Sequence, residues 1–194
     1  YYEELEKLYG KAKYYSMDPF HEGGNTEGVD LAKAGTSIMG AMKKANPEAV
    51  WVMQAWQANP REAMVNTLDS GDLLVLDLYS EKLPQWGDPE SMWYREKGFG
   101  KHDWLYCMLL NFGGNVGLHG RMEQLVNGYY NACAHINGKT LRGVGATPEG
   151  IENNPMMFEL LYELPWREER FSPDIWLQGY LKARYGDDLS PEVT

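Results

Sequence analysis

The sequence predicts an α/β fold, a (β/α)8 TIM-type barrel that is incomplete within these 194 residues. Five short apolar runs have the pattern of strands, and helical segments separate them at intervals of about 24 to 37 residues, which favours parallel βα units. Each run ends in polar or aromatic residues, as expected where a site is assembled from the carboxyl ends of many barrel strands. A doubly wound open sheet is the alternative, although its site usually lies at one switch point.

The predicted strands are apolar runs bounded by turn-forming residues. Residues 73–79 (LLVLDLY) and 104–110 (WLYCMLL) are clear buried strands. Residues 50–56 (VWVMQAW) have the near-continuous apolar pattern of a strand covered on both faces. The remaining two strands are residues 13–20, which break at a proline, and residues 141–146 (LRGVGA).

Helical segments precede, separate and follow these strands. Thr26 is expected to cap a helix that ends at Asn46, before a proline, and Pro60 fits the first turn of a short helix. The expected helices are residues 2–12, 26–45, 60–68, 118–134, 155–164 and 173–185. Because five strands cannot close an eight-stranded barrel, we expect residues 1–194 to be part of one catalytic-barrel domain, with further segments before residue 1 and after residue 194.

Composition restricts the class of partner. Lys and Arg number 18 and Asp and Glu number 28, so the formal net charge is −10. This charge argues against a nucleic-acid or anionic membrane partner, but it does not argue against a neutral ligand such as a sugar. No apolar run approaches the roughly 18 residues of a transmembrane helix. Cys107 and Cys133 form no C-x-x-C pattern, so neither a disulfide scaffold nor a zinc ribbon is indicated.

Two glutamates occupy similar positions after different strands. Glu22 and Glu149 each follow a predicted strand, lie next to a glycine and come shortly after a proline. Carboxylates at the ends of different barrel strands meet in one cleft, which is the arrangement that glycoside hydrolysis needs. The competing interpretation is that both are surface-loop residues among 28 acidic side chains. Glu81 also follows a strand and competes for a catalytic role, whereas Asp77, inside an apolar run, is expected to give structural support.

Aromatic and polar residues at the strand ends are candidates for binding a ligand. Trp56 ends a strand and is placed to stack on a sugar, whereas Trp51 lies earlier in the same run and is expected in the core. Tyr79 and Asn111 follow two further strands and are expected on the same face. Metal and nucleotide motifs are incomplete: His21 and Glu22 resemble the start of H-E-x-x-H, but residue 25, where the second histidine would stand, is asparagine.

Several sequence blocks resemble the α-N-acetylglucosaminidases of glycoside hydrolase family 89. The blocks occur in the order of the family and extend over about residues 13–167, most of the chain. They are residues 18–24 (DPFHEGG), 49–56 (AVWVMQAW), 73–81 (LLVLDLYSE), 111–118 (NFGGNVGL), 148–154 (PEGIENN) and 163–167 (ELPWR). No single block is decisive, but their order through apolar strands is highly specific.

The resemblance implies a retaining exo-glycosidase that removes terminal α-linked N-acetylglucosamine from a glycan. It assigns the acid/base to Glu22 and the nucleophile to Glu149, and it matches Trp56 with a tryptophan that lines the sugar pocket. His21 precedes the acid/base, where some relatives carry asparagine, and either residue can hydrogen-bond a sugar hydroxyl. The resemblance implies no metal or organic cofactor, and an extracellular or periplasmic location in a bacterium or a lysosomal one in an animal.

Two other functions compete with this interpretation. One is a non-catalytic carbohydrate-binding remnant of the same fold, which would keep the aromatic residues and bind sugar without turnover. The other is a different barrel enzyme that depends on a metal, for which a divalent ion at Glu22 or Glu81 would be the sign. The sequence gives no indication of the oligomeric state, and the 194-residue chain by itself is expected to be inactive.

Overall fold

A single sheet of five parallel strands forms the centre of the computed structural model, which describes residues 1–111, 119–151 and 153–186. The strands are β1 (Tyr14–Ser16), β2 (Val50–Ala55), β3 (Leu73–Asp77), β4 (Asp103–Met108) and β5 (Leu141–Ala146). Each strand pairs in parallel with the next in the chain, so the order is β1-β2-β3-β4-β5. A sequential order without reversal is that of a β/α barrel, whereas a doubly wound sheet reverses at its switch point.

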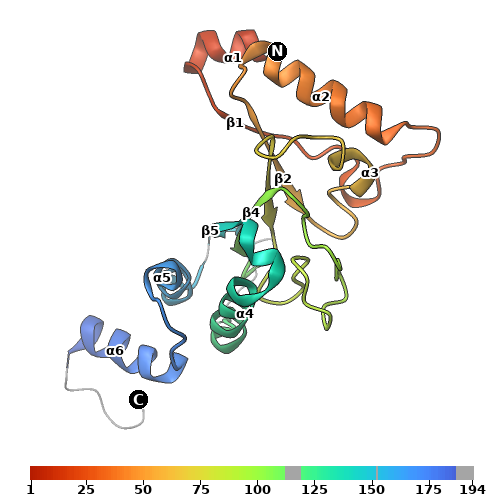
Figure 1. Cartoon of the computed structure of the whole chain (residues 1–194). Helices are drawn as coiled ribbons and strands as arrows, with labels where there is room; N and C mark the ends of the chain where they lie inside the picture. Colours follow the sequence, from red (N-terminus) through yellow and green to blue (C-terminus); the bar gives the residue numbers. More distant parts are fainter. Residues whose placement is uncertain (112–118, 152, 187–194) are drawn as a thin grey trace.

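Helices lie at both ends of the described chain and between successive strands, except between β3 and β4, which a long loop joins (Figure 1). The α-helices are α1 (Tyr2–Tyr9), α2 (Leu31–Ala45), α3 (Glu62–Val65), α4 (Met122–Ala134), α5 (Pro155–Glu163) and α6 (Pro173–Tyr185). Three short 3₁₀ turns, η1 (His21–Gly23), η2 (Ile136–Thr140) and η3 (Leu164–Trp166), complete the secondary structure of the described residues. Figure 1 shows α1 and α2 at one end of the molecule and α5 and α6 at the other, with the sheet between them.

Several predicted boundaries are wrong. Pro60 is not in the first turn of α3, which spans Glu62–Val65 after its N-cap residue, and β3 and β4 end two residues earlier than expected. Local hydrogen bonding explains two further differences. Thr26 does not cap α2, because Asp30 takes that position and its side chain accepts the N–H of Lys33 at 3.0 Å. The strand expected over residues 13–20 ends at Ser16, and the side chain of Asp18, rather than a backbone carbonyl, then accepts the N–H of Gln54 at 2.7 Å. The expected start of the helix over residues 118–134 lies partly outside the described residues.

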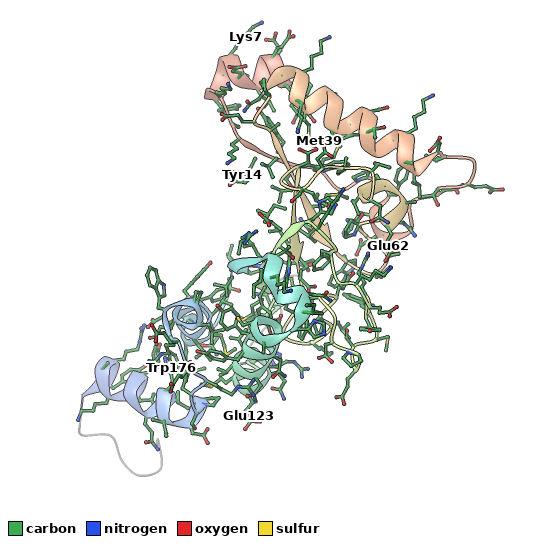
Figure 2. All side chains as sticks on the ribbon, in the orientation of Figure 1. Lys7, Tyr14, Met39, Glu62, Glu123 and Trp176 are labelled. Atoms are coloured by element: carbon green, nitrogen blue, oxygen red, sulfur yellow. The ribbon has the colours of Figure 1, made fainter. Side chains whose placement is uncertain are left out.

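The strands alternate between two environments. Trp51 and Met53 of β2 and Val75 of β3 are fully buried in a core that α2 and α3 share, and Met39 on α2 belongs to the same core (Figures 1 and 2). The intervening positions of β2 and β3 are only partly buried within the part of the chain that the structure describes. The prediction of a strand covered on both faces therefore holds for the helix-facing side of β2 only. None of the described helices is long and apolar enough to cross a lipid bilayer.

Candidate active site

The predicted site residues all follow strands of the one parallel sheet. Parallel strands bring their carboxyl ends to one edge, so the loops that follow them share that edge. His21 and Glu22 follow β1, Trp56 follows β2, Tyr79 follows β3, Asn111 follows β4 and Glu149 follows β5. Glu22 and Glu149 thus belong to the loops after the two outermost strands of the sheet, with the other candidates on the loops between them.

The loop that carries Glu22 has an unusual backbone. Phe20 and Glu22 both adopt left-handed conformations, with φ of 60° and 48°. Such a conformation costs a non-glycine residue of order 1 kcal/mol or more, and it persists only where the surroundings enforce it. Gly24 allows the loop to close on itself, because a Cβ there would lie 2.6 Å from the Cα of Phe20. The loop therefore turns the exposed side chain of Glu22 away from the regular path of the strand.

Asp18 fastens this loop to the end of β2. Its Oδ1 accepts the backbone N–H of Gln54 at 2.7 Å and the side-chain N–H of Asn59 at 3.2 Å. Burial raises the pKa of the Asp18 carboxyl, although its hydrogen bonds to Gln54 and Asn59 and the nearby His21 act in the opposite direction. Asn59 in turn donates to the carbonyl of Gln54 at 2.6 Å. One side chain thus joins the loops after β1 and β2.

Aromatic rings form a continuous row across the ends of β2 and β3. The ring centroids of Trp56 and Tyr79 lie 6.3 Å apart with planes inclined by 26°. Trp56 also makes a T-shaped contact with Trp93, with ring centroids 4.6 Å apart and planes inclined by 71°. Burial raises the pKa of the Tyr79 phenol, the charge of Glu81 raises it further, and a hydrogen bond from Arg121 opposes the shift. Trp56 and Tyr79 thus stack at the strand ends, and Trp93 extends the row.

Asn111 holds the loop that carries Glu149. Its side chain is buried, its Oδ1 accepts the N–H of Gly150 at 3.1 Å, and its Nδ2 donates to Oδ1 of Asn153. Asn153 donates to the carbonyl of Gly150 at 2.8 Å. Gly150 adjoins Glu149, so this pair of amides fixes the backbone beside the exposed glutamate. Residues 112–118 of the NFGGNVGL block lie outside the described residues.

The loop after β5 is also tied to two neighbouring strands. The hydroxyl of Thr147 donates to the carbonyl of Leu78 at 2.9 Å, and its backbone N–H donates to the carbonyl of Met108 at 3.0 Å. Thr147 stands two residues before Glu149 and continues the pairing of β5 with β4. The Glu149 loop is thus held on both sides of the glutamate.

Asp77 and Glu81 support the fold of the loops around the site. Asp77 is fully buried and its carboxylate accepts the N–H groups of Gln85 and Trp86, at 2.9 and 3.1 Å. Glu81 accepts the N–H groups of Leu109 and Leu110, at 3.1 and 2.8 Å. Burial raises the pKa of each carboxyl to about 7, against the opposing effect of these hydrogen bonds. Backbone amides thus engage the carboxylate of Glu81, which favours a structural role over a catalytic one.

One polar group near the strand ends lacks a hydrogen-bond partner among the described residues. Within the part of the chain that the structure describes, Nε2 of His21 is buried and makes no hydrogen bond. The same residues contain no group of three or more His, Cys, Asp or Glu side chains that could hold a metal ion. Sequence reasoning missed Asp18, Thr147 and Trp93, whose partners lie 36 or more positions away along the chain and leave no local signal.

Comparisons with known proteins converge on one family. The family model described as "Alpha-N-acetylglucosaminidase (NAGLU) tim-barrel domain" matches residues 1–168. Human alpha-N-acetylglucosaminidase is 36% identical in an alignment of 196 positions that covers 94% of this chain and 25% of the human protein.

Solved structures agree with the sequence matches. A family 89 glycoside hydrolase from Clostridium perfringens in complex with PUGNAc has a TM-score of 0.86 and 33% identity. The same bacterial enzyme, with two glutamates replaced by glutamine, was solved with its substrate GlcNAc-α-1,4-galactose and has a TM-score of 0.87 and 32% identity. Each covers 99% of this chain, and the chain spans 21% of each bacterial protein.

Proposed function

This chain belongs to the alpha-N-acetylglucosaminidase (NAGLU) family, and on that premise we propose that it carries the catalytic pair of a glycoside hydrolase. The enzyme removes terminal, non-reducing α-linked N-acetylglucosamine from a glycan and retains the configuration of the anomeric carbon. The reaction needs no cofactor, because two carboxyl groups supply the acid, the base and the nucleophile.

One observation carries this proposal. Glu22 and Glu149 stand on loops that follow two strands of one parallel sheet, at the edge where barrel enzymes assemble their sites. Each loop is fastened to its neighbour by a side chain, Asp18 in one case and Asn111 in the other. The bacterial relative holds its substrate in a variant with two glutamates replaced by glutamine, which agrees with a pair of functional glutamates.

In the proposed mechanism the two glutamates act in two steps. Glu149 attacks the anomeric carbon, and the bond from that carbon to the leaving oxygen breaks as Glu22 delivers a proton to the oxygen. A covalent glycosyl-enzyme results. Glu22, now a carboxylate, removes a proton from a water molecule that attacks the same carbon, and Glu149 departs as a carboxylate. A retaining pair requires carboxyl groups about 5–5.5 Å apart in the substrate complex.

The neighbouring side chains give the pocket its specificity for a sugar. The ring of Trp56, backed by Tyr79, offers an apolar face to the C–H groups of a pyranose. His21 has a buried ring nitrogen available to a sugar hydroxyl. Asn111 is the proposed polar contact from the loop after β4, and it also fixes the Glu149 loop. These four residues, together with the two glutamates, are the proposed substrate contacts.

The experiment follows the anomeric configuration of the product. The longest natural polypeptide that contains this sequence is incubated with GlcNAc-α-1,4-galactose, and proton NMR records which anomer of GlcNAc appears first. We expect the α anomer, followed by slow mutarotation. First appearance of the β anomer would overturn the retaining mechanism. Binding of the disaccharide without any turnover would instead identify a carbohydrate-binding protein that has lost catalysis.

A further inference from the structure

Arg95 joins the two loops that follow β2 and β3. It stands on the long loop between β3 and β4, and its side chain is half-buried. Its Nε donates to the side-chain oxygen of Gln85 at 2.6 Å, and its Nη1 donates to the carbonyl oxygen of Pro60 at 2.9 Å. Pro60 belongs to the loop after β2, 35 positions earlier in the chain. Because the donors of a guanidinium lie in one rigid plane, these two bonds fix the spacing of the two loops.

The partner of Arg95 on its own loop is firmly held. Gln85 is fully buried, and the buried carboxylate of Asp77 accepts its backbone N–H at 2.9 Å. The same carboxylate accepts the N–H of Trp86 at 3.1 Å, and the carbonyl of Trp86 accepts a hydrogen bond from the side chain of Asn137 at 2.8 Å. Gln85 thus lies on a segment that is joined both to the end of β3 and to η2, and it gives Arg95 a fixed support.

At the other end of this bridge, Pro60 follows directly on Asn59, which organises the loop after β2. The backbone N–H of Asn59 donates to the carbonyl of Trp56 at 2.9 Å, and the N–H of Trp56 donates to the carbonyl of Asn59 at 3.1 Å. The side-chain amide of Asn59 donates to Oδ1 of Asp18 at 3.2 Å. Asp18 stands four residues before Glu22. A bridge that fixes Pro60 therefore reaches the loop of the proposed acid/base through two further side chains.

Arg95 makes its hydrogen bonds as a cation. Burial lowers the pKa of its guanidinium, the carboxyl groups of Glu62 and Asp77 raise it, and the charge of Arg61 lowers it. An arginine side chain remains protonated in proteins over the whole working range of pH. Hydrogen bonds from a charged donor are stronger than those between neutral groups, so the bridge is a strong connection between the two loops.

We propose that Arg95 is a positioning residue for the acid/base Glu22, an inference that rests on the proposed function. The guanidinium fixes Pro60 and with it the adjacent Asn59, and Asn59 holds Asp18, which fastens the Glu22 loop to the end of β2. Arg95 acts through these residues and not on the reacting atoms. Its loss should displace the acid/base from the leaving oxygen and should spare the nucleophile.

The test measures how strongly the rate depends on proton assistance. The intact polypeptide hydrolyses two aryl α-N-acetylglucosaminides, one with a poor and one with a good leaving group, and the measured quantity is the ratio of kcat/KM for the first to kcat/KM for the second. Changes in sugar binding cancel in this ratio because both substrates carry the same sugar. Arg95→Ala should lower the ratio about 10-fold, since a small displacement of a reacting group is costly. Arg95→Lys, which can keep one of the two bonds, should recover part of the loss.

A double variant shows whether Arg95 acts through Asp18. Asp18→Ala alone should also lower the ratio about 10-fold. If both residues hold the same loop, the double variant should lower the ratio little further, whereas independent effects would multiply to about 100-fold. Arg142→Ala removes a guanidinium that pairs with Asp103 at 2.8 Å and should leave the ratio at its original value. An unchanged ratio in Arg95→Ala, or full multiplication in the double variant, would overturn the proposal.

Hydrogen exchange separates this proposal from the proposed function. In Arg95→Ala the backbone amides of residues 17–24 and 54–60 should exchange faster than in the unmodified polypeptide, measured by mass spectrometry. Unchanged exchange in β3 and β4 would show that the variant is folded, and Arg142→Ala should exchange as the unmodified protein does. If the unmodified polypeptide hydrolyses neither substrate, the proposed function fails, and the exchange rates still decide whether Arg95 holds the Glu22 loop. Unchanged exchange of residues 17–24 in Arg95→Ala would overturn the proposal.

Discussion

The loops that carry Glu22 and Glu149 are held in place by different means. The Glu22 loop depends on two left-handed residues, Phe20 and Glu22 itself, and on one buried carboxylate, Asp18. The Glu149 loop depends on uncharged groups, chiefly the side-chain amide of Asn111. The Glu22 loop thus combines a left-handed backbone with an ionisable anchor, whereas neutral hydrogen-bonding groups hold the Glu149 loop.

The difference corresponds to the different tasks proposed for the two glutamates. A nucleophile must stay at one distance from the anomeric carbon, and several hydrogen bonds to neutral partners fix its backbone without altering the local charge. An acid/base gains and loses a proton within each cycle. Its loop carries the strain and the titratable anchor, so changes in this loop should affect proton transfer more than bond formation.

The largest expected loss of activity distinguishes the proposed nucleophile, Glu149, from the proposed acid/base, Glu22. Glu149→Ala should abolish the glycosyl-enzyme on every substrate, because this variant lacks the proposed nucleophile. Glu22→Ala should lose about 10²- to 10⁴-fold on substrates with poor leaving groups, yet keep appreciable activity on aryl glycosides whose leaving groups depart with little proton assistance. Initial rates across a series of aryl α-N-acetylglucosaminides, measured in the intact polypeptide, give this dependence.

Azide provides the control for the same pair. In Glu149→Ala an azide ion that enters from the vacated side should give a glycosyl azide of inverted configuration. In Glu22→Ala azide should intercept the glycosyl-enzyme and give the retained product. An inverted product from Glu22→Ala would mean that the roles are exchanged, and absence of rescue in both variants would remove support for either role.

A smaller loss of activity is expected when the side chains that hold the two loops, Asp18 and Asn111, are removed and both glutamates are kept. Asp18→Ala should release the Glu22 loop from Gln54, and Asn111→Ala should release the Glu149 loop from Gly150. We expect a fall of roughly 10- to 100-fold in kcat for each, since small displacements of a reacting group are costly. In Asp18→Ala, kcat should depend more steeply on the pKa of the leaving group. In Asn111→Ala, kcat should fall by the same factor for every leaving group.

The conservative variant distinguishes positioning from a general loss of structure. Asp18→Asn keeps an oxygen acceptor for the N–H of Gln54 and should restore most of the rate and the original leaving-group dependence. Matching leaving-group dependences in Asp18→Ala and Asn111→Ala would contradict the distinction between the two loops.

Much of the fold follows from the sequence because its strands are strong local signals. Residues 141–146 form a strand with the predicted bounds, and β2 differs from its prediction by one residue. Three α-helices begin where the sequence predicts, at Tyr2, Pro155 and Pro173. Thr26 and Asp30 are both good caps, and the sequence did not indicate that Asp30 would cap α2. The spacing of the strands predicts a parallel sheet, and the polar and aromatic residues at the strand ends favoured a barrel over a doubly wound sheet.

The supporting residues of the site were not predictable in the same way. The rule that barrel sites lie at strand ends located the loops of Glu22 and Glu149. It gave no indication that Asn111 would bind the loop 39 positions further along the chain, or that Trp93 would contact Trp56. Such contacts depend on the three-dimensional approach of loops, and a single sequence contains no periodicity that reveals them.

The smallest expected effect of a substitution is on the free energy of unfolding. It tests whether the buried Glu81 carboxyl gains and loses a proton while it holds the neighbouring backbone. Burial raises the pKa of its carboxyl from 4.5 to about 7, so the folded state holds a proton that the unfolded state releases between these values. The contribution of the protonated Glu81 side chain to the free energy of unfolding is therefore complete below about pH 4.5. It is lost as the pH rises to about 7. Glu81→Gln cannot titrate, and it retains an oxygen for the N–H groups of Leu109 and Leu110.

Relative to the unmodified protein, Glu81→Gln should gain stability as the pH rises from 4.5 to 7. At about 1.4 kcal/mol per pKa unit the gain in unfolding free energy is at most roughly 3 kcal/mol. The thermal midpoint of the barrel domain at pH 5 and pH 7.5 measures it. Glu123→Gln removes the same charge from an exposed position on α4 and corrects for the change in net charge. A difference between Glu81→Gln and the unmodified protein that is equal at both pH values would show that Glu81 holds Leu109 and Leu110 as a permanent anion.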